Sequence, residues 1–262
     1  MSMHDTGLFV TDLSVSYGRK KVISSLSLGP IAPGEVVALL GPNAAGKSTV
    51  LRGIAGLGRS TGRVFLGGND LTRLSLPERA KRIAYMPQSQ PPAIGLPVIE
   101  AVMSARSASV GRKTAMEEAF DALERLGIGH LAMQPLSELS GGQRQMIALT
   151  QAIVRQPAVL LLDEPTSALD LRHQIHVMDY SVAMARERGT IVVAVLHDIG
   201  LALRYADRIA ILQNGHLQAF GNPEDIVTQQ MLAEVYGIAG RIERCSQGRI
   251  QMIVDGPFHA TH

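Results

Sequence analysis

Residues 41–48 read Gly-Pro-Asn-Ala-Ala-Gly-Lys-Ser, which matches the pattern Gly-x-x-x-x-Gly-Lys-Ser of a phosphate-binding loop. The uncharged apolar run 36–40 precedes the loop and predicts a buried strand, and Lys47 opens a helical pattern. Strand, loop and helix in this order are the context that the motif needs, so a structural Gly-rich turn is disfavoured. Kinases, GTPases, helicases and transport ATPases all share the motif, so it alone does not choose among them.

The loop offers the groups that a nucleoside triphosphate requires. Backbone N–H groups of residues 44–48 and the positive end of the following helix can converge on the β-phosphate. Lys47 can reach the β- and γ-oxygens, and Ser48 can bind Mg²⁺. We therefore predict that ATP is bound by Gly41, Pro42, Asn43, Ala44, Ala45, Gly46, Lys47 and Ser48, with Thr49 as a lesser neighbour of the α-phosphate.

Two adjacent acids, Asp163 and Glu164, follow the apolar run 158–162. The length of this run and its lack of charge predict a strand buried on both faces of a parallel sheet. Ligands of open α/β sheets bind at the carboxyl ends of such strands. Asp163 is therefore a predicted Mg²⁺ ligand acting through water, and Glu164 a predicted base for the attacking water. The alternative, two residues that merely begin a helix, is disfavoured by the apolar run.

A second glycine motif lies between the loop and the acids and consists of Leu139, Ser140, Gly141, Gly142 and Gln143. Together with the loop, the run 160–165, the stretch 167–170 and His197, it resembles the motifs of the nucleotide-binding subunit of an ABC transporter. The resemblance runs in order over nearly the whole chain. It implies an α/β fold with a P-loop NTPase (RecA-like) core, an antiparallel β layer and an inserted helical subdomain. It also implies an ATPase coupled to transmembrane transport, with ATP and Mg²⁺ as cofactors.

The Ser-Gly-Gly motif is a predicted second anion site. Ser140 and the N–H groups of Gly141 and Gly142 begin the helical stretch 143–156, where the helix dipole favours negative charge. The resemblance implies a homodimer paired head to tail, in which each signature closes the ATP bound by the partner. A plain helix cap by Ser140 is the alternative for the motif taken alone.

Four further residues receive roles from the resemblance. Tyr17 is expected to stack on adenine, which contributes about 1–3 kcal/mol, although an edge-strand Tyr is a fair alternative. Gln88 is expected to contact Mg²⁺ or the attacking water and to begin the segment that meets the membrane partner. His197 follows the strand-like run 190–196 and is expected to bond the γ-phosphate. Asp170 is expected to couple the two sites at the subunit boundary, and it can also cap the next helix.

The phosphate loop departs from the family pattern at one point. Ala44 and Ala45 stand where the family commonly has Gly followed by a small residue. If position 44 requires a positive φ, Ala44 carries a modest strain. Small side chains still leave room for phosphate, so we expect nucleotide binding to survive.

The cargo is suggested by resemblance alone. The stretches 197–207 and 232–237 look like those of ATPases that import iron chelates, haem or vitamin B12. Iron–siderophore uptake is the first expectation, haem or cobalamin the next, and another small solute an alternative. The expected partners are polytopic permease subunits and, indirectly, a substrate-binding protein, at the cytoplasmic face of the inner membrane.

Two other classes of protein remain open. A small-molecule P-loop kinase has no use for the motif 139–143, which counts against it. Repair ATPases usually insert long coiled coils between the two glycine motifs, whereas here only residues 49–138 intervene, without sustained heptads. A soluble ABC assembly ATPase is harder to dismiss.

Composition agrees with this interpretation. An apolar content of 46% in 262 residues excludes intrinsic disorder, and a formal net charge of +2 is too slight to argue for nucleic acid. The lone cysteine, Cys245, excludes an intrachain disulfide framework, and His173 and His176 lack further ligands for a metal site. No segment approaches the ~20 apolar residues of a membrane span, and residues 1–5 lack a signal-sequence pattern.

The chain is predicted to be one ABC ATPase domain over 1–262. Residues 1–96 and 157–262 are expected to form the core with its β layer and C-terminal extension, and 97–156 the helical subdomain. Strands are predicted at 8–16, 22–28, 35–40, 62–66, 158–163, 190–196, 208–213 and 216–220, with a turn at Asn214-Gly215. Helices are predicted at 114–126, 143–155, 171–188 and 199–206, followed by a short helix ending at Tyr236 and a hairpin around Gln247-Gly248. The alternation after Pro157 predicts a parallel sheet.

Overall fold

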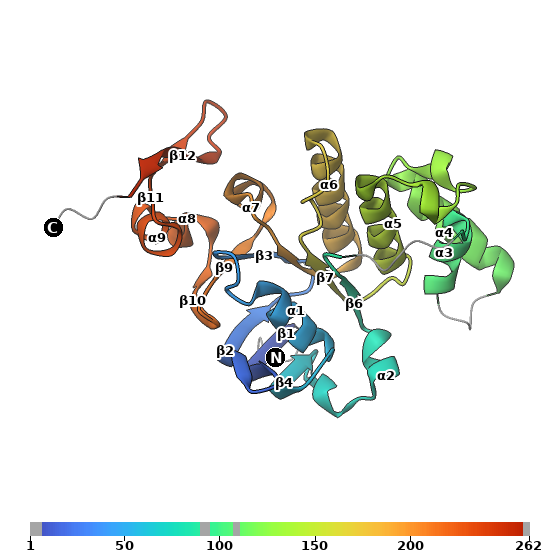
Figure 1. Cartoon of the computed structure of the whole chain (residues 1–262), viewed down its shortest axis with the longest axis horizontal. Helices are drawn as coiled ribbons and strands as arrows, with labels where there is room; N and C mark the ends of the chain where they lie inside the picture. The colour runs from blue at the N-terminus through green and yellow to red at the C-terminus, as the bar shows by residue number, and fades with distance from the viewer. Residues whose placement is uncertain (1–6, 90–94, 107–110, 259–262) are drawn as a thin grey trace.

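A six-stranded sheet forms the centre of the protein in the computed structural model, which describes residues 7–89, 95–106 and 111–258 (Figure 1). The strand order is β10-β9-β3-β8-β7-β6, with β10 antiparallel to β9 and the other neighbours parallel. The strands are β3 (Val36–Leu40), β6 (Ile83–Met86), β7 (Val159–Asp163), β8 (Ile191–Val195), β9 (Arg208–Gln213) and β10 (His216–Gly221). The predicted parallel sheet is thereby confirmed.

Three of the four inner strands, β3, β7 and β8, are buried at every residue. Their runs carry no charge until the terminal Asp163, because both faces of the sheet are covered and no position can point to water. Since these strands are parallel, the loops after β3, β6, β7 and β8 all leave the same edge of the sheet. This edge therefore gathers the loop after β3, the acids after β7 and the residues after β6 and β8.

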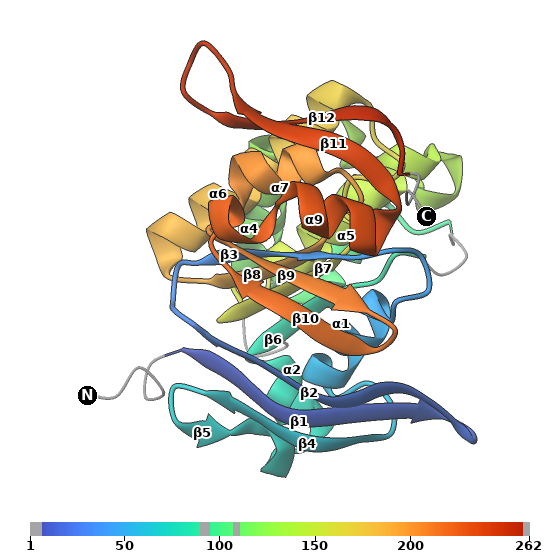
Figure 2. The same ribbon diagram turned by 90° about the vertical axis from the view of Figure 1, so that its left-hand side faces the viewer.

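An antiparallel sheet covers one face of the central sheet, as predicted (Figure 2). Helix α1 (Lys47–Ala55) lies between the two sheets, and its apolar residues Val50, Leu51 and Ile54 are fully buried there. The antiparallel strands are β1 (Leu8–Tyr17), β2 (Lys20–Ile31), β4 (Ser60–Leu66) and the short β5 (Asn69–Asp70). Strand β2 is longer than the predicted 22–28, because its pairing with β1 continues through irregular register.

The opposite face of the central sheet is covered by helices. Helices α5 (Gly141–Ile153), α6 (Leu171–Arg188) and α7 (Ile199–Tyr205) lie against the strands, α3 (Val98–Ala105) and α4 (Arg112–Arg125) pack against α5, and the short α2 (Leu76–Ala80) precedes β6. The predicted helices at 114–126 and 143–155 each begin two residues earlier than expected. For α5 the reason is a reciprocal cap, since Ser140 Oγ accepts from the N–H of Gln143 and the Gln143 side chain accepts from the N–H of Ser140.

The C-terminal part differs from the prediction at one place. The predicted turn at Asn214-Gly215 is confirmed, with φ of 51° and 76°. The single short helix predicted to end at Tyr236 is wrong, because extended backbone at Val227 and Thr228 separates α8 (Pro223–Ile226) from α9 (Gln229–Met231). Thr228 begins a new helix by accepting from the N–H of Met231 at 3.1 Å. A π-helical turn, Leu232–Tyr236, follows α9.

A hairpin of β11 (Ile238–Arg244) and β12 (Ile250–Pro257) ends the described chain, as predicted around Gln247-Gly248. Within the described ranges, no helix has both the length and the apolar character to cross a membrane. The prediction about a signal sequence concerns residues 1–5, which lie outside the described residues.

Candidate functional site

The phosphate loop joins β3 to α1 and depends on two glycines. Gly41 has φ of 145°, and a Cβ there would lie 2.0 Å from the carbonyl oxygen of Leu212. Gly46 has φ of 101°, and a Cβ there would lie 2.6 Å from Ile23 Cδ1. Both backbone conformation and space therefore exclude a side chain at these positions.

Ala44 has a φ of 62°, so position 44 of the loop does require a positive φ and the alanine lies in the left-handed region. A non-glycine residue in this region carries strain on the order of 1 kcal/mol. The side chain is exposed, so the strain lies in the backbone and not in a clash. The loop thus adopts the conformation that the motif requires in spite of the alanine.

Lys47 is 6% exposed and folds back over its own loop. Its Nζ donates to the carbonyl oxygens of Gly41 at 2.7 Å and Pro42 at 2.9 Å. Burial lowers the pKa of the Lys47 ammonium, while the charges of Glu164 and Asp163 act in the opposite direction. The ammonium group is thus held at the mouth of the loop by two neutral acceptors, which an anion can replace.

Asp163 lies at the end of β7, facing the start of α1. Ser48 Oγ donates to its Oδ1 at 2.8 Å, and the hydroxyl of Tyr85 donates to its Oδ2 at 2.9 Å. Burial raises the pKa of Asp163, against the effect of these two hydrogen bonds. Tyr85 on β6 was missed by the sequence reasoning, which assigned no strand to 83–86. Burial and the neighbouring Asp163 also raise the pKa of Tyr85.

Because the pKa of Asp163 is raised above its ordinary value of 3.8 in the folded protein, its ionised form opposes folding. This destabilisation is absent below pH 3.8, develops as the pH rises from 3.8 to the raised pKa, and is complete above the raised pKa. Asp163→Asn is therefore expected to stabilise the Mg²⁺-free protein at pH 7.5 by roughly 0.5–2 kcal/mol, the usual range of stabilising single changes. Urea unfolding of both proteins at pH 4.5 and 7.5 measures the difference, which should be smaller at pH 4.5. A less stable Asp163→Asn protein at pH 7.5 would contradict this account.

Glu164 contacts two predicted catalytic residues, Gln88 and His197, that lie far from it in the sequence. Its Oε1 lies 2.6 Å from His197 Nε2, and its Oε2 accepts from Gln88 Nε2 at 2.7 Å. The Glu164 side chain is only 13% exposed, whereas that of His197 is 45% exposed at the edge of the site. The backbone of Glu164 has φ of 52°, a strained conformation of the kind found at functional sites. The three predicted catalytic residues thus meet at the ends of β7, β8 and β6.

Gln145 is a second residue that the sequence reasoning missed. It is buried on α5, its Nε2 donates to the carbonyl oxygen of Glu164 at 2.7 Å, and its Oε1 accepts from the N–H of Ala168 at 3.1 Å. Both ends of the amide are therefore used to hold the loop after β7. The sequence carries no distinctive signal for it, because the same helical stretch also contains Gln143, Arg144 and Gln151.

The signature residues lie on the other face of the central sheet from α1 (Figure 1). Leu139 is buried and anchors the turn, whereas Ser140 and Gly141 are exposed at the start of α5. Among the described residues, no hydrogen bond joins 139–143 to the phosphate loop. The structure therefore leaves the predicted second anion site open on the surface.

Asp170 and Tyr17 occupy surface positions. Asp170 caps α6 by accepting from the N–H of His173 at 2.9 Å, and it also lies 2.8 Å from His173 Nδ1. Hydrogen bonds from His173 lower the pKa of Asp170. Tyr17 ends β1 and is 48% exposed, so one face of its ring is available to a ligand.

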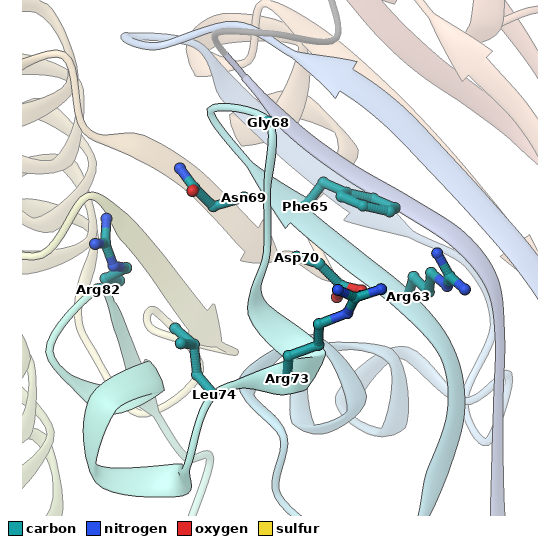
Figure 3. A pocket seen from close by; sticks show the side chains of 8 residues that line it. All are labelled: Arg63, Phe65, Gly68, Asn69, Asp70, Arg73, Leu74 and Arg82. Carbon is teal, nitrogen blue, oxygen red and sulfur yellow. The ribbon is translucent and has the colours of Figure 1, made fainter.

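A separate pocket of about 390 Å³ lies at the edge of the antiparallel sheet (Figure 3). Its charged lining residues are Arg63, Asp70, Arg73 and Arg82. Arg73 pairs with Asp70 at 3.3 Å, and its side chain is 76% exposed, as in an ordinary solvated surface. None of the predicted ATP-site residues lines this pocket, so it is separate from the chemistry described above.

Comparison with known proteins places these features in a family. The family described as ABC transporter matches residues 25–167, which include the phosphate loop, the signature and the acidic pair. The chain is 38% identical over 238 residues to the hemin import ATP-binding protein HmuV of Bordetella pertussis, covering 87% of this chain and 90% of that protein. It is 35% identical to the ferric enterobactin transport ATP-binding protein FepC of Escherichia coli, covering 95% of this chain and 90% of that protein.

Two solved structures agree with these relatives. One is an inward-facing conformation of a putative metal-chelate type ABC transporter, with a TM-score of 0.79 and 25% identity over 97% of this chain and 98% of that chain. The other is a dimeric bacterial ABC transporter cassette, with a TM-score of 0.74 and 27% identity over 82% of this chain and 98% of that chain.

Proposed function

The chain belongs to the ABC transporter family and has the fold of its ATPase cassettes, and on that premise we propose that it drives the import of a chelated metal ion. The protein is an ATPase coupled to transport. The observation that supports the proposed ATP hydrolysis is a cluster of side chains at one edge of the sheet. Lys47, the Ser48–Asp163 pair and Glu164 lie there, and they offer a phosphate-binding charge, oxygen ligands for Mg²⁺ and a base for the attacking water.

In this proposal the phosphate loop binds ATP through the N–H groups of residues 44–48 and through Lys47. Lys47 leaves the carbonyl oxygens of Gly41 and Pro42 and turns to the β- and γ-oxygens, to which it makes stronger, charge-assisted bonds. The exposed ring of Tyr17 stacks on the base. The remaining residues around the phosphates are Gly41, Pro42, Asn43 and Thr49.

The oxygen donors of Ser48 and Asp163 fit Mg²⁺, which prefers hard oxygen ligands and keeps several waters. Their 2.8 Å contact shows that the two donors already share one location, and Tyr85 holds the second carboxylate oxygen of Asp163 in place. When bound, the ion supplies charge neutralisation at the β- and γ-phosphates. Gln88 contacts Glu164 in the structure, so we assign its predicted contact with the ion to the ATP-bound state.

Glu164 is proposed to accept the proton of the attacking water. Its two carboxylate oxygens are oriented by His197 and Gln88, and its backbone is held by Gln145. His197 is exposed enough to reach the γ-phosphate while keeping its contact with Glu164. Asp170, at the start of α6, is proposed to couple this site to the second one.

We propose that two copies pair head to tail around two ATP molecules. The signature lies on the face of the sheet opposite α1 and cannot close the phosphate loop of its own chain without rearrangement. Ser140 and the N–H groups of Gly141 and Gly142 present a helix N-terminus to the partner's γ-phosphate. We propose that α3, α4 and α5 of the predicted helical subdomain move as one unit in this closure.

The proposed cargo is an iron chelate, either a ferric siderophore or haem. The similar proteins described above are named for hemin and for ferric enterobactin, and a similar solved structure is named for a metal chelate. The proposed partners are a polytopic permease and, indirectly, a substrate-binding protein, with this chain at the cytoplasmic face of the membrane. The segment after Gln88 is expected to meet the permease, and its residues 90–94 lie outside the described residues.

The test is to coexpress the tagged chain with the polytopic permease encoded nearest to its gene and to place the purified complex in liposomes. ATP hydrolysis is expected to rise several-fold when a substrate-binding protein loaded with a ferric siderophore or haem is enclosed. Hydrolysis without such stimulation by any chelate would remove the cargo assignment. A chain that never copurifies with the permease would instead favour a soluble assembly ATPase.

A further inference from the structure

The C-terminal segment contacts the phosphate loop directly. The hydroxyl oxygen of Tyr236 accepts a hydrogen bond from the N–H of Gly41 at 2.9 Å, across 195 residues of sequence. Tyr236 ends the π-helical turn Leu232–Tyr236, and Leu232 of this turn is fully buried in the core cluster beneath the helices. The buried leucine fixes the turn, so the tyrosine hydroxyl is held at a defined position.

The peptide groups on both sides of Gly41 are engaged. Its N–H donates to Tyr236, and its carbonyl oxygen accepts from Lys47 Nζ at 2.7 Å. Gly41 is buried, and the nearby carbonyl oxygen of Leu212 leaves it little room to move. A buried N–H requires an acceptor, and Tyr236 supplies it. Burial raises the pKa of Tyr236, so its hydroxyl stays neutral at physiological pH.

The far side of the loop is held in a different way. The carbonyl oxygen of Ala45 accepts from the N–H of Gly215 in the β9–β10 turn at 3.1 Å. That bond joins two backbone groups and does not depend on a side chain. Tyr236 therefore provides a side-chain anchor for the start of the loop from outside the loop's own motif.

We propose that Tyr236 is a positioning residue of the phosphate loop, through which the C-terminal segment sets the affinity for ATP. Lys47 must leave the carbonyl oxygen of Gly41 when it turns to a phosphate. Because Tyr236 accepts from the N–H of Gly41, Gly41 keeps its orientation when Lys47 moves away. The loop therefore keeps the conformation that binds the phosphates. The inference rests on the ATP binding proposed for residues 41–48.

Tyr236→Phe tests the inference, because it removes only the hydroxyl and keeps the ring. The loss of one neutral hydrogen bond to a buried N–H is expected to raise the KM for ATP roughly 3- to 10-fold. The kcat is expected to stay within about 2-fold, because Glu164, Gln88 and His197 do not contact Tyr236. The KM and kcat come from steady-state hydrolysis, and the Kd from titration with a fluorescent ATP analogue.

Tyr205→Phe is the matched control, since it makes the same chemical change on α7, where no described hydrogen bond links the hydroxyl to the phosphate loop. Its KM should equal that of the wild type.

Tyr236→Leu also removes the ring and is expected to lower the unfolding temperature as well as the affinity for ATP. Comparing it with Tyr236→Phe separates the effect of ring packing from that of the hydroxyl. A wild-type KM and Kd in Tyr236→Phe would overturn the inference, and so would a fall in kcat with unchanged KM. A wild-type protein that fails to bind ATP would instead remove the proposed function.

Discussion

Glu164→Gln is expected to slow steady-state ATP hydrolysis by about 100-fold or more, the usual contribution of a positioned general base. The substitution keeps the shape of the side chain and one of the two oxygens that contact Gln88 and His197, but it replaces the other oxygen with an NH2 donor and removes the carboxylate that accepts a proton from water. ATP affinity should remain within a few-fold of the wild type, because Lys47 and the loop N–H groups are untouched. ATP should therefore accumulate unhydrolysed between two copies.

Light scattering coupled to size-exclusion chromatography shows whether ATP holds two copies of the Glu164→Gln protein together. The Glu164→Gln protein should run as a dimer with ATP and as a monomer after ATP is removed. Glu187→Gln is the matched control, because Glu187 is exposed near the end of α6 and contacts no site residue among the described hydrogen bonds and ion pairs. Unchanged hydrolysis in Glu164→Gln would remove Glu164 from its role. A Glu164→Gln protein that binds ATP and stays monomeric would sink the proposed head-to-tail pair.

Lys47→Ala is expected to weaken ATP binding by about 10- to 100-fold, since hydrogen bonds to charged groups contribute roughly 1.5–3 kcal/mol. Lys47 provides a buried positive charge at the mouth of the loop, and alanine provides neither charge nor donor. Without it, the negative charge of the β- and γ-phosphates is opposed only by the backbone dipoles of the loop and by the bound Mg²⁺. Isothermal titration calorimetry with ATP and Mg²⁺ measures the loss directly.

The folded state should tolerate this change. Burial disfavours the charged ammonium of Lys47 in the absence of nucleotide, so alanine removes a destabilised charge, which offsets the loss of the donor to the carbonyl oxygens of the buried Gly41 and the half-buried Pro42. The unfolding temperature should thus stay close to that of the wild type. Lys113→Ala on the exposed side of α4 is the control and should bind ATP normally. Wild-type affinity in Lys47→Ala would refute the assignment of the loop.

Most strands and the phosphate loop could be predicted because their signals are local, whereas β6 was missed. The runs 36–40 and 158–162 are apolar without interruption and strand-sized, which is typical of a strand covered on both faces. The glycines of the loop meet a steric requirement that the motif itself records, as the contact of Gly41 with Leu212 shows. The break at Val227 and Thr228 was missed because the capping by Thr228 is a weak signal beside a generally helical composition.

What the sequence alone determined is which residue types stand at the ends of which apolar runs. From these positions it predicts that phosphate, Mg²⁺ and water are bound along one edge of a parallel sheet. Only the tertiary structure decided which residues hold the site in place. Tyr85 donates to Asp163, Gln145 donates to the carbonyl oxygen of Glu164, and Tyr236 accepts from the N–H of Gly41. The physical reason is that a single hydrogen bond between residues 19 to 195 positions apart leaves no periodic trace in the chain. It exists only once the packing of both faces of the sheet has fixed where each side chain points.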